Sequence, residues 1–225
     1  MAIDTQITLE PRKTPVQARA AVTVDAISEA TIQVLLGQGA DRLTTTRVAE
    51  RAGVSVGTLY QYYPNKQSLL FAVLEHHMGK VATAVETACE RARHKPLLEM
   101  VREVVESFVD AKMERTDISM ALYRIAADVG GPAIVKRSGL RSRKALEKLL
   151  ESAQDVASPP ERFAIETMFA AMAGATRAVL EAGASPAMVR KLRVHLVMLC
   201  QSYMEAVTSH RSAHSKIFSS THSIT

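Results

Sequence analysis

The stretch from residue 44 to residue 66, TTTRVAERAGVSVGTLYQYYPNK, constrains the fold more than any other part of this chain. Thr44 and Ser55 stand where a side-chain hydroxyl caps the start of a helix. Gly53 stands between them, where a helix ends, because glycine readily adopts the left-handed backbone of a helix C-terminus. The spacing predicts two short helices joined by a tight turn, at 45–52 and 56–62, and a third that begins near residue 66.

The two short helices carry apolar residues on one side and polar residues on the other. Val48 and Leu59 lie on the inward side, and Ala49 is small where the helices must approach closely. The outer side of the second helix presents Tyr60 and Gln61, whose polar groups can bond to base edges or phosphates. An ordinary helical hairpin inside an all-α domain is the alternative interpretation. The agreement of caps, turn glycine and polar outer face favours a helix-turn-helix that reads DNA.

This stretch resembles the TetR/AcrR family of bacterial transcriptional regulators, whose hallmark is an alanine-glycine-valine-serine turn followed by a threonine-leucine-tyrosine recognition helix. The resemblance covers about the first third of the chain and implies that Thr45 and Lys66 contact DNA phosphates. Tyr63 stands where many relatives have phenylalanine, and its hydroxyl is expected to add a phosphate contact. The expected DNA-binding residues are Thr44, Thr45, Thr46, Arg47, Ser55, Val56, Gly57, Thr58, Tyr60, Gln61, Tyr62, Tyr63 and Lys66.

Length and composition fit a folded, cytoplasmic protein. A chain of 225 residues, of which 47% are hydrophobic, can bury a full core as one compact domain or two small ones. There is no apolar run near the roughly 18 residues of a membrane span and no hydrophobic signal segment, so we expect no membrane partner. Cys89 and Cys200 have no paired spacing, which argues against a disulfide framework and a zinc cluster. We expect neither a metal nor a cofactor.

The net charge of +5 is compatible with a nucleic-acid partner. Residues 1–66 hold seven Lys and Arg against six Asp and Glu, so affinity is expected to depend on a few placed contacts and on dimerisation. The densest basic run of the chain has two open interpretations. It is either a solvated helix face or the rim of a binding site that attracts an anionic effector. That run consists of Lys136, Arg137, Arg141, Arg143, Lys144 and Lys148.

Apolar residues recur at intervals of three and four almost throughout, which predicts an all-α fold of about nine helices. The predicted helices span 19–37, 45–52, 56–62, 66–92, 97–115, 117–129, 132–155, 160–182 and 186–209. They define an N-terminal arm and helix-turn-helix domain at 1–65, with its motif at 44–63. An effector-binding and dimerisation domain at 66–209 and a disordered tail at 210–225 follow. Arg12 and Lys13 belong either to a disordered start or to an arm that reaches DNA.

The last two predicted helices indicate a homodimer. Residues 194–200, VHLVMLC, are apolar around most of the helix, and such a helix must be covered on more than one side. A four-helix interface built from these two helices of each subunit meets that need, and the family resemblance implies it. A buried hairpin within one subunit is the alternative. The expected interface residues are Ile165, Met168, Phe169, Val179, Leu192, Leu196, Leu199 and Tyr203.

An effector cavity is expected between the DNA-reading part and these helices. Apolar residues line one side of the helices predicted at 66–92 and 97–115, with polar points among them. Each residue taken singly is more often core than ligand contact. The expected pocket residues are His77, Val81, Val104, Phe108, Met120, Tyr123, Met172 and Thr176.

These observations predict a repressor that binds a palindromic DNA operator as a dimer and is released by a small apolar or amphipathic effector. A ligand-independent architectural DNA-binding protein is one alternative, and a helical enzyme is another. The enzyme class is disfavoured because the adjacent His76 and His77 cannot chelate one metal from a helix. No nucleophile elbow, phosphate-binding loop or paired-carboxylate motif is present either, so no catalytic residues are predicted.

Overall fold

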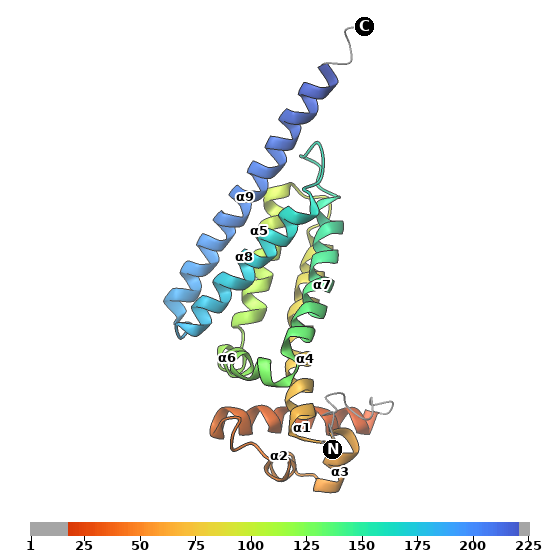
Figure 1. Ribbon diagram of the computed structural model, residues 1–225, viewed down its shortest axis with the longest axis vertical. Helices are drawn as coiled ribbons and strands as arrows, with labels where there is room; N and C mark the ends of the chain where they lie inside the picture. Colours follow the sequence, from red (N-terminus) through yellow and green to blue (C-terminus); the bar gives the residue numbers. More distant parts are fainter. Residues whose placement is uncertain (1–17, 221–225) are drawn as a thin grey trace, which may run out of the picture. The chain divides into compact units, whose positions relative to one another are not determined.

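The computed structural model describes residues 18–220, and all regular structure within that range is helical (Figure 1). This confirms the predicted all-α fold. The elements are α1 (Ala18–Gln38), α2 (Thr45–Ala52), α3 (Val56–Tyr62), α4 (Lys66–Arg91), α5 (Leu97–Met113), α6 (Thr116–Ile125), the 3₁₀ helix η1 (Ala126–Val129), α7 (Gly131–Leu150), α8 (Arg162–Glu181) and α9 (Pro186–Ser220).

The helices pack as two compact units, each with its own hydrophobic core. The first unit contains the chain up to Gly79 and residues 117–137, and the second contains residues 80–116 and the chain from Ser138 onward. Both α4 and α7 contribute residues to the two units. The predicted division after residue 65 differs from this packing. Asn65 marks only where α4 begins, and a helix start does not reveal which core the helix joins.

The first unit is built around the first three helices and the beginning of α4. Ile27 of α1, Val48 of α2 and Leu59 of α3 are wholly buried in one apolar cluster. Asn65 caps α4 as predicted, because its side-chain oxygen accepts a hydrogen bond of 2.8 Å from the Ser68 backbone N–H. The cap fixes the point at which α4 begins after the recognition helix.

The centre of the second unit consists of α5, α8 and α9 (Figure 1). α8 and α9 form an antiparallel hairpin, and α5 runs antiparallel to α9. The Gln201 side-chain amide donates a hydrogen bond of 2.7 Å to the Leu98 carbonyl, and Arg193 pairs with Asp110. These two contacts fix the register of α5 against α9. Their shared core contains Met100, Val104, Val105, Phe108, Met168, Met172, Leu192 and Leu196.

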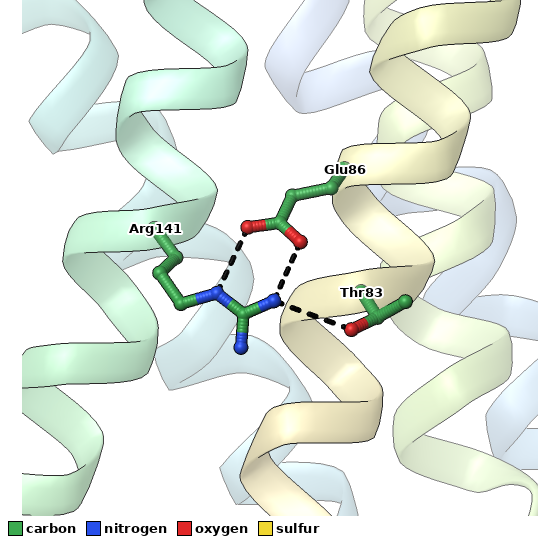
Figure 2. A network of polar contacts seen from close by, with 3 residues as sticks. All are labelled: Thr83, Glu86 and Arg141. Carbon is green, nitrogen blue, oxygen red and sulfur yellow. Dashed lines mark hydrogen bonds and ion pairs between the residues drawn. The ribbon is translucent and has the colours of Figure 1, made fainter.

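Polar contacts tie α7 to α4 within each unit. In the second unit, Arg141 makes two hydrogen bonds to the Glu86 carboxylate, at 2.9 and 2.6 Å, and one of 3.3 Å to the Thr83 hydroxyl (Figure 2). In the first unit, Arg137 forms an ion pair with Glu75. The hydrogen bonds that Arg141 donates to the Glu86 carboxylate raise the pKa of Arg141. Part of the basic run is therefore paired with acidic residues of α4 rather than simply solvated.

Several helix ends differ from the predicted ones. α7 ends at Leu150, five residues before the predicted end at 155. The segment predicted as one helix at 117–129 is α6 followed by η1, and Gly130 closes η1 with a left-handed φ of 70°. α9 continues to Ser220, so residues 210–220 are helical where the sequence predicted a disordered tail. No glycine or proline occurs in that stretch to end the helix. Arg12 and Lys13 lie outside the described residues.

Two helical segments are long and apolar enough to cross a membrane by length and composition, namely Ala20–Gln38 and Arg162–Glu181. The helical segments Thr116–Val129 and Gly131–Leu150 are bent by 116° relative to each other. Taken together as one span, they are also long and apolar enough to cross a membrane. The prediction that no such segment exists is therefore wrong. Alanine and the larger aliphatic residues raise the hydropathy of these helices, while few charges lower it. Each long helix nevertheless buries one face in a core, Ile27 and its neighbours in α1 and Met168 and its neighbours in α8.

Candidate nucleic-acid interface

The first helix of the motif, α2, has the caps that the sequence predicts. The Thr44 hydroxyl accepts a hydrogen bond of 3.3 Å from the Arg47 backbone N–H. At the other end, Gly53 has φ 67° and ψ 30°, and its N–H bonds to the carbonyls of Ala49 and Glu50. A residue with a β-carbon would be strained in this left-handed conformation. Gly53 therefore sets the turn that leads to the next helix.

The second helix of the motif, α3, begins at a serine cap. The Ser55 hydroxyl accepts a hydrogen bond of 3.0 Å from the Thr58 backbone N–H, and the two side-chain hydroxyls lie 2.8 Å apart. Leu59 is wholly buried and anchors the inner face of the helix. Tyr60 and Gln61, one position further along, are exposed. α3 is thus anchored by the buried Leu59 on its inner face and presents polar side chains on its outer face.

Gly57 lies in the first turn of α3, where a helix that enters a DNA groove comes closest to the nucleic acid. A β-carbon added there would meet only the Ser55 hydroxyl oxygen, at 3.7 Å, which is an ordinary contact. The φ of Gly57 is not in the left-handed region. The packing of the protein itself therefore does not require glycine at this position.

Two hydrogen bonds hold the outer side chains of the motif in place. The Thr45 hydroxyl and the Tyr60 phenol lie 3.0 Å apart and join the start of α2 to the outer face of α3. The Arg47 guanidinium donates a hydrogen bond of 2.5 Å to the Arg42 carbonyl. These contacts place one hydroxyl pair and one fixed positive charge on the exposed side of the motif.

Lys66 begins α4 and is half-buried. Its amino group donates a hydrogen bond of 3.3 Å to the Ala40 carbonyl in the loop before α2. The amino group is thus held beside the motif, and a phosphate contact there would compete with the Ala40 carbonyl for its protons.

Among the residues predicted to contact DNA, Tyr63 is the one that the structure buries. Its side chain is only 5% exposed and belongs to the core of the first unit. Burial raises the pKa of Tyr63, and the charges of Asp25 and Tyr62 raise it further. Tyr63 lines a pocket of about 350 Å³ between α1 and α4, so its side chain packs inside the unit rather than on the outer face of the motif. The other expected DNA-binding residues are exposed or half-buried.

Two family models match the chain. Residues 27–73 match the bacterial regulatory proteins of the tetR family, and residues 96–204 match the tetracyclin repressor-like C-terminal domain. The chain belongs to the TetR family. It is a DNA-binding transcriptional regulator, and the matched families and relatives are regulators rather than enzymes.

Named relatives resemble this TetR-family regulator over part of their length. The transcriptional repressor KstR of Rhodococcus jostii is 28% identical over 138 residues, which are 60% of this chain and 61% of KstR. The nucleoid occlusion factor SlmA of Haemophilus ducreyi is 40% identical over 72 residues, 30% of this chain and 35% of SlmA. The similarity thus spans about a third to three fifths of these relatives.

A solved structure extends the similarity of fold to most of the chain. The regulator FadR of Bacillus subtilis, in complex with stearoyl-CoA, superposes with a TM-score of 0.65 at 16% identity. The superposition covers 80% of this chain and 98% of FadR. At this identity the comparison shows a common fold.

The predicted dimer residues divide by burial. Ile165, Met168, Leu192 and Leu196 lie in the core of the second unit, so they do not form an outward face. Phe169, Val179 and Tyr203 are half-buried against that core, and Leu199 is 53% exposed. Sequence reasoning missed the exposed apolar side chains of Phe163, Val194 and Met198. Because residues 194–200 of α9 are apolar around most of the helix, hydropathy alone did not show which side faces inward.

The predicted effector residues fall in both units. His77, Met120 and Tyr123 belong to the first unit, where the His77 ring nitrogen lies 3.1 Å from the Ser119 hydroxyl. Val81, Val104, Phe108, Met172 and Thr176 belong to the second unit and are buried. Across the described residues, no group of three or more His, Cys, Asp or Glu side chains is placed to hold a metal ion.

Proposed function

We propose that this regulator is a repressor that binds a palindromic operator as a homodimer in the cytoplasm and releases it when a small apolar or amphipathic compound binds. The outer face of α3 is the observation that carries this proposal. Tyr60 and Gln61 are exposed above the buried Leu59, and the Ser55 cap fixes the helix that presents them. Such a helix reads base edges in the major groove, and two-fold related copies read the two halves of a palindrome.

The exposed faces of α8 and α9 support a homodimer. Phe163 is 72% exposed on α8, and Val194, Met198 and Leu199 are more than half exposed on α9. Soluble monomers rarely leave several large apolar side chains on one helical hairpin exposed together, so a partner is expected to cover them. The exposed side of α8 also carries small residues, namely Ala170, Gly174 and Ala178. A β-carbon at Gly174 would meet nothing within 4 Å, which leaves room for a partner helix.

The second unit supports the effector part of the proposal. It matches the tetracyclin repressor-like C-terminal domain, and the structurally similar FadR of Bacillus subtilis was solved with stearoyl-CoA. A helical unit of this size exceeds what a two-helix dimer interface needs. We infer that its core accepts an apolar or amphipathic molecule.

α4 is the proposed connection between ligand and DNA. It begins at Lys66 beside the motif and runs without a break to Arg91, contributing Leu70 to one core and Val85 to the other. An effector that binds one arrangement of α4 more tightly than another shifts the population towards it. In a dimer, such a shift changes the spacing of the two recognition helices and hence the affinity for an operator of fixed half-site spacing.

Mapping the genomic DNA bound by the regulator tests this proposal. A repressor of this kind occupies a small number of promoter sites that share an inverted repeat. Compounds related to the products of the neighbouring genes are then added to the purified complex with DNA. Release of the operator by one of them supports the proposal, whereas tight binding that no such compound changes contradicts the effector part.

The similarity to the nucleoid occlusion factor SlmA favours a second candidate, a DNA-binding protein that acts along the chromosome without an effector. That similarity is confined to about 72 residues. The same mapping experiment separates the two candidates. Many sites scattered over the chromosome and away from promoters would favour the second one.

A further inference from the structure

The pocket between α1 and α4 belongs entirely to the first unit, which contains the helix-turn-helix. Its inner walls are formed by the buried side chains of Ile27 of α1 and of Leu69 and Val73 of α4. The exposed Asp25 of α1 and His76 of α4 lie at its edge, where it meets solvent. Its volume of about 350 Å³ falls within the range of small-molecule sites, roughly 300 to 1,000 Å³. We call it the α1–α4 pocket.

Tyr63 brings a polar group to the α1–α4 pocket from the end of α3. Its side chain is 5% exposed, and its phenol makes no hydrogen bond to another described residue. In the described part of the chain, the Thr176 hydroxyl is the one side-chain group that both lacks a partner and is shut off from solvent. The phenol oxygen of Tyr63 therefore reaches solvent space, which the pocket that it lines provides. A polar group buried in this way needs a partner from outside the protein.

Asp25 places a negative charge near this phenol. Burial is the main cause of the raised pKa of Tyr63, and the charge of Asp25 adds to it, so the two groups lie close enough to interact. Asp25 makes no hydrogen bond or ion pair with another described residue. Glu75 also lines the pocket, but Arg137 pairs with it. Apart from the imidazole of His76, Asp25 is thus the one charged group of the lining that no described residue neutralises.

We propose that the α1–α4 pocket binds a small organic cation, a protonated amine on a compact apolar body, with its ammonium group between the Asp25 carboxylate and the Tyr63 phenol. An ammonium donates protons, and both oxygens accept them, the carboxylate in a charge-assisted bond. The buried walls suit an apolar body, and the charge of Asp25 disfavours an anion of the same size.

This site is separate from the effector region of the second unit. All residues that line it belong to the first unit, so the inference does not depend on the proposed release of the operator. The Tyr63 backbone N–H donates a hydrogen bond of 2.9 Å to the Leu59 carbonyl at the end of α3. A ligand in the pocket therefore contacts the residue that ends the recognition helix.

The experiment uses the full-length protein and three probes that share one ring and a short chain, 2-phenylethylamine, 2-phenylethanol and 3-phenylpropanoate. Calorimetry measures their binding to the parent, to Asp25→Asn and to the control Glu29→Gln. Glu29 is an exposed carboxylate of α1, about one turn after Asp25, and does not line the pocket. We expect the amine to bind the parent and the control at least about tenfold more tightly than the alcohol or the acid. Asp25→Asn is expected to remove this preference and to keep its affinity for the alcohol.

Two further variants test the position of the site. Tyr63→Phe is expected to weaken binding of both the amine and the alcohol by about fivefold, because both lose the phenol as a partner. Ala72→Leu places a larger side chain in the lining and is expected to abolish binding of both. Circular dichroism and thermal unfolding without any probe show whether each variant is folded. The Tm of Tyr63→Phe is expected to equal or exceed that of the parent, because the phenol makes no hydrogen bond within the described residues.

Four results would each overturn the proposal. Absence of binding by all three probes would mean that the pocket holds water alone. Equal affinity of the parent for amine and alcohol, or an amine preference that persists in Asp25→Asn, would remove the role of the carboxylate. Loss of the preference in Glu29→Gln as well would assign it to the general charge of α1. A clear fall in the Tm of Tyr63→Phe would show that the phenol has a structural role instead.

Discussion

The phenol of Tyr60 and the hydroxyl of Thr45 lie 3.0 Å apart, so the outer face of α3 is linked to the first residue of α2. This bond orients Tyr60 towards the neighbouring helix. Gln61, the next residue, is exposed and makes no side-chain hydrogen bond within the described part of the chain. Its amide can therefore both donate to and accept from a base edge, as glutamine does with adenine in the major groove.

Gln61→Ala is predicted to relax base preference at one position of each half-site by about 1 to 3 kcal/mol. Lys66→Ala is the matched comparison, because an amino group near a phosphate contributes to all sequences alike. Binding profiles over randomised operators distinguish the two effects. Identical profiles for Gln61→Ala and the parent would show that Gln61 reads no base.

Leu199→Glu is predicted to give folded monomers that no longer bind the operator. Leu199 is 53% exposed on the proposed dimer face, so a charge there does not enter the core of the subunit. Leu196→Glu places its charge in that core, where Leu196 is 2% exposed, and is expected to unfold the second unit. Light scattering and circular dichroism report mass and folding. A dimeric Leu199→Glu with intact operator binding would mean that another surface mediates association.

The sequence predicted the motif well because its determinants are local. The caps at Thr44 and Ser55 and the left-handed turn at Gly53 depend on residues a few positions away, and the structure confirms all three. The proposed dimer face depends on which side of the apolar stretch 194–200 meets α5, and the local pattern of that stretch does not contain this information. Leu196 and Leu199 are three residues apart and equally apolar, yet one is buried and the other exposed.

Tyr63 shows the same limit inside the motif. It belongs to a run of three tyrosines within four residues, and the sequence offered no sign that this one turns inward. Packing against the core of the first unit decides its position. The division into units likewise depends on contacts between distant segments, such as residues 117–137 with the chain up to Gly79.

Stability is predicted to rise with pH between about 8 and 9 because of Lys112. Its pKa is about 8 in the folded protein and near 10.5 when unfolded, so in this range the unfolded chain binds more protons. The contribution of Lys112 to the free energy of unfolding then increases by up to about 1.4 kcal/mol per pH unit. Denaturant titrations measure the slope, and Lys112→Met should flatten it. An equal slope in that variant would assign the effect to another group.

The two cysteines act in the opposite direction in the same pH range. Burial raises the pKa of Cys89 to about 12 and that of Cys200 to about 11, whereas unfolded thiols ionise near 9.0. From about pH 8 upward the unfolded chain loses thiol protons before the folded protein does, so these two groups lower stability as pH rises and oppose Lys112. The contribution of Lys112 is therefore taken from the difference in slope between the parent and Lys112→Met, in which the thiol contribution cancels.

Val104→Trp is predicted to lower stability by about 1 to 3 kcal/mol or more, because Val104 is fully buried among close neighbours in the core of the second unit. Arg102→Trp, on the exposed side of the same helix, serves as the control for helix propensity. Thermal unfolding of both variants checks the expectation. Undiminished stability of Val104→Trp would show that vacant space adjoins Val104.

Selection of bound duplexes from a random DNA pool by the purified full-length protein tests the central claim most directly. A homodimer that reads DNA through two copies of α3 enriches an inverted repeat whose half-sites are centred about one DNA turn, or a multiple of it, apart. Gln61→Ala, run in parallel, should enrich the same repeat with one degenerate position in each half. Enrichment of no sequence, or of a single half-site without its repeat, would contradict the account.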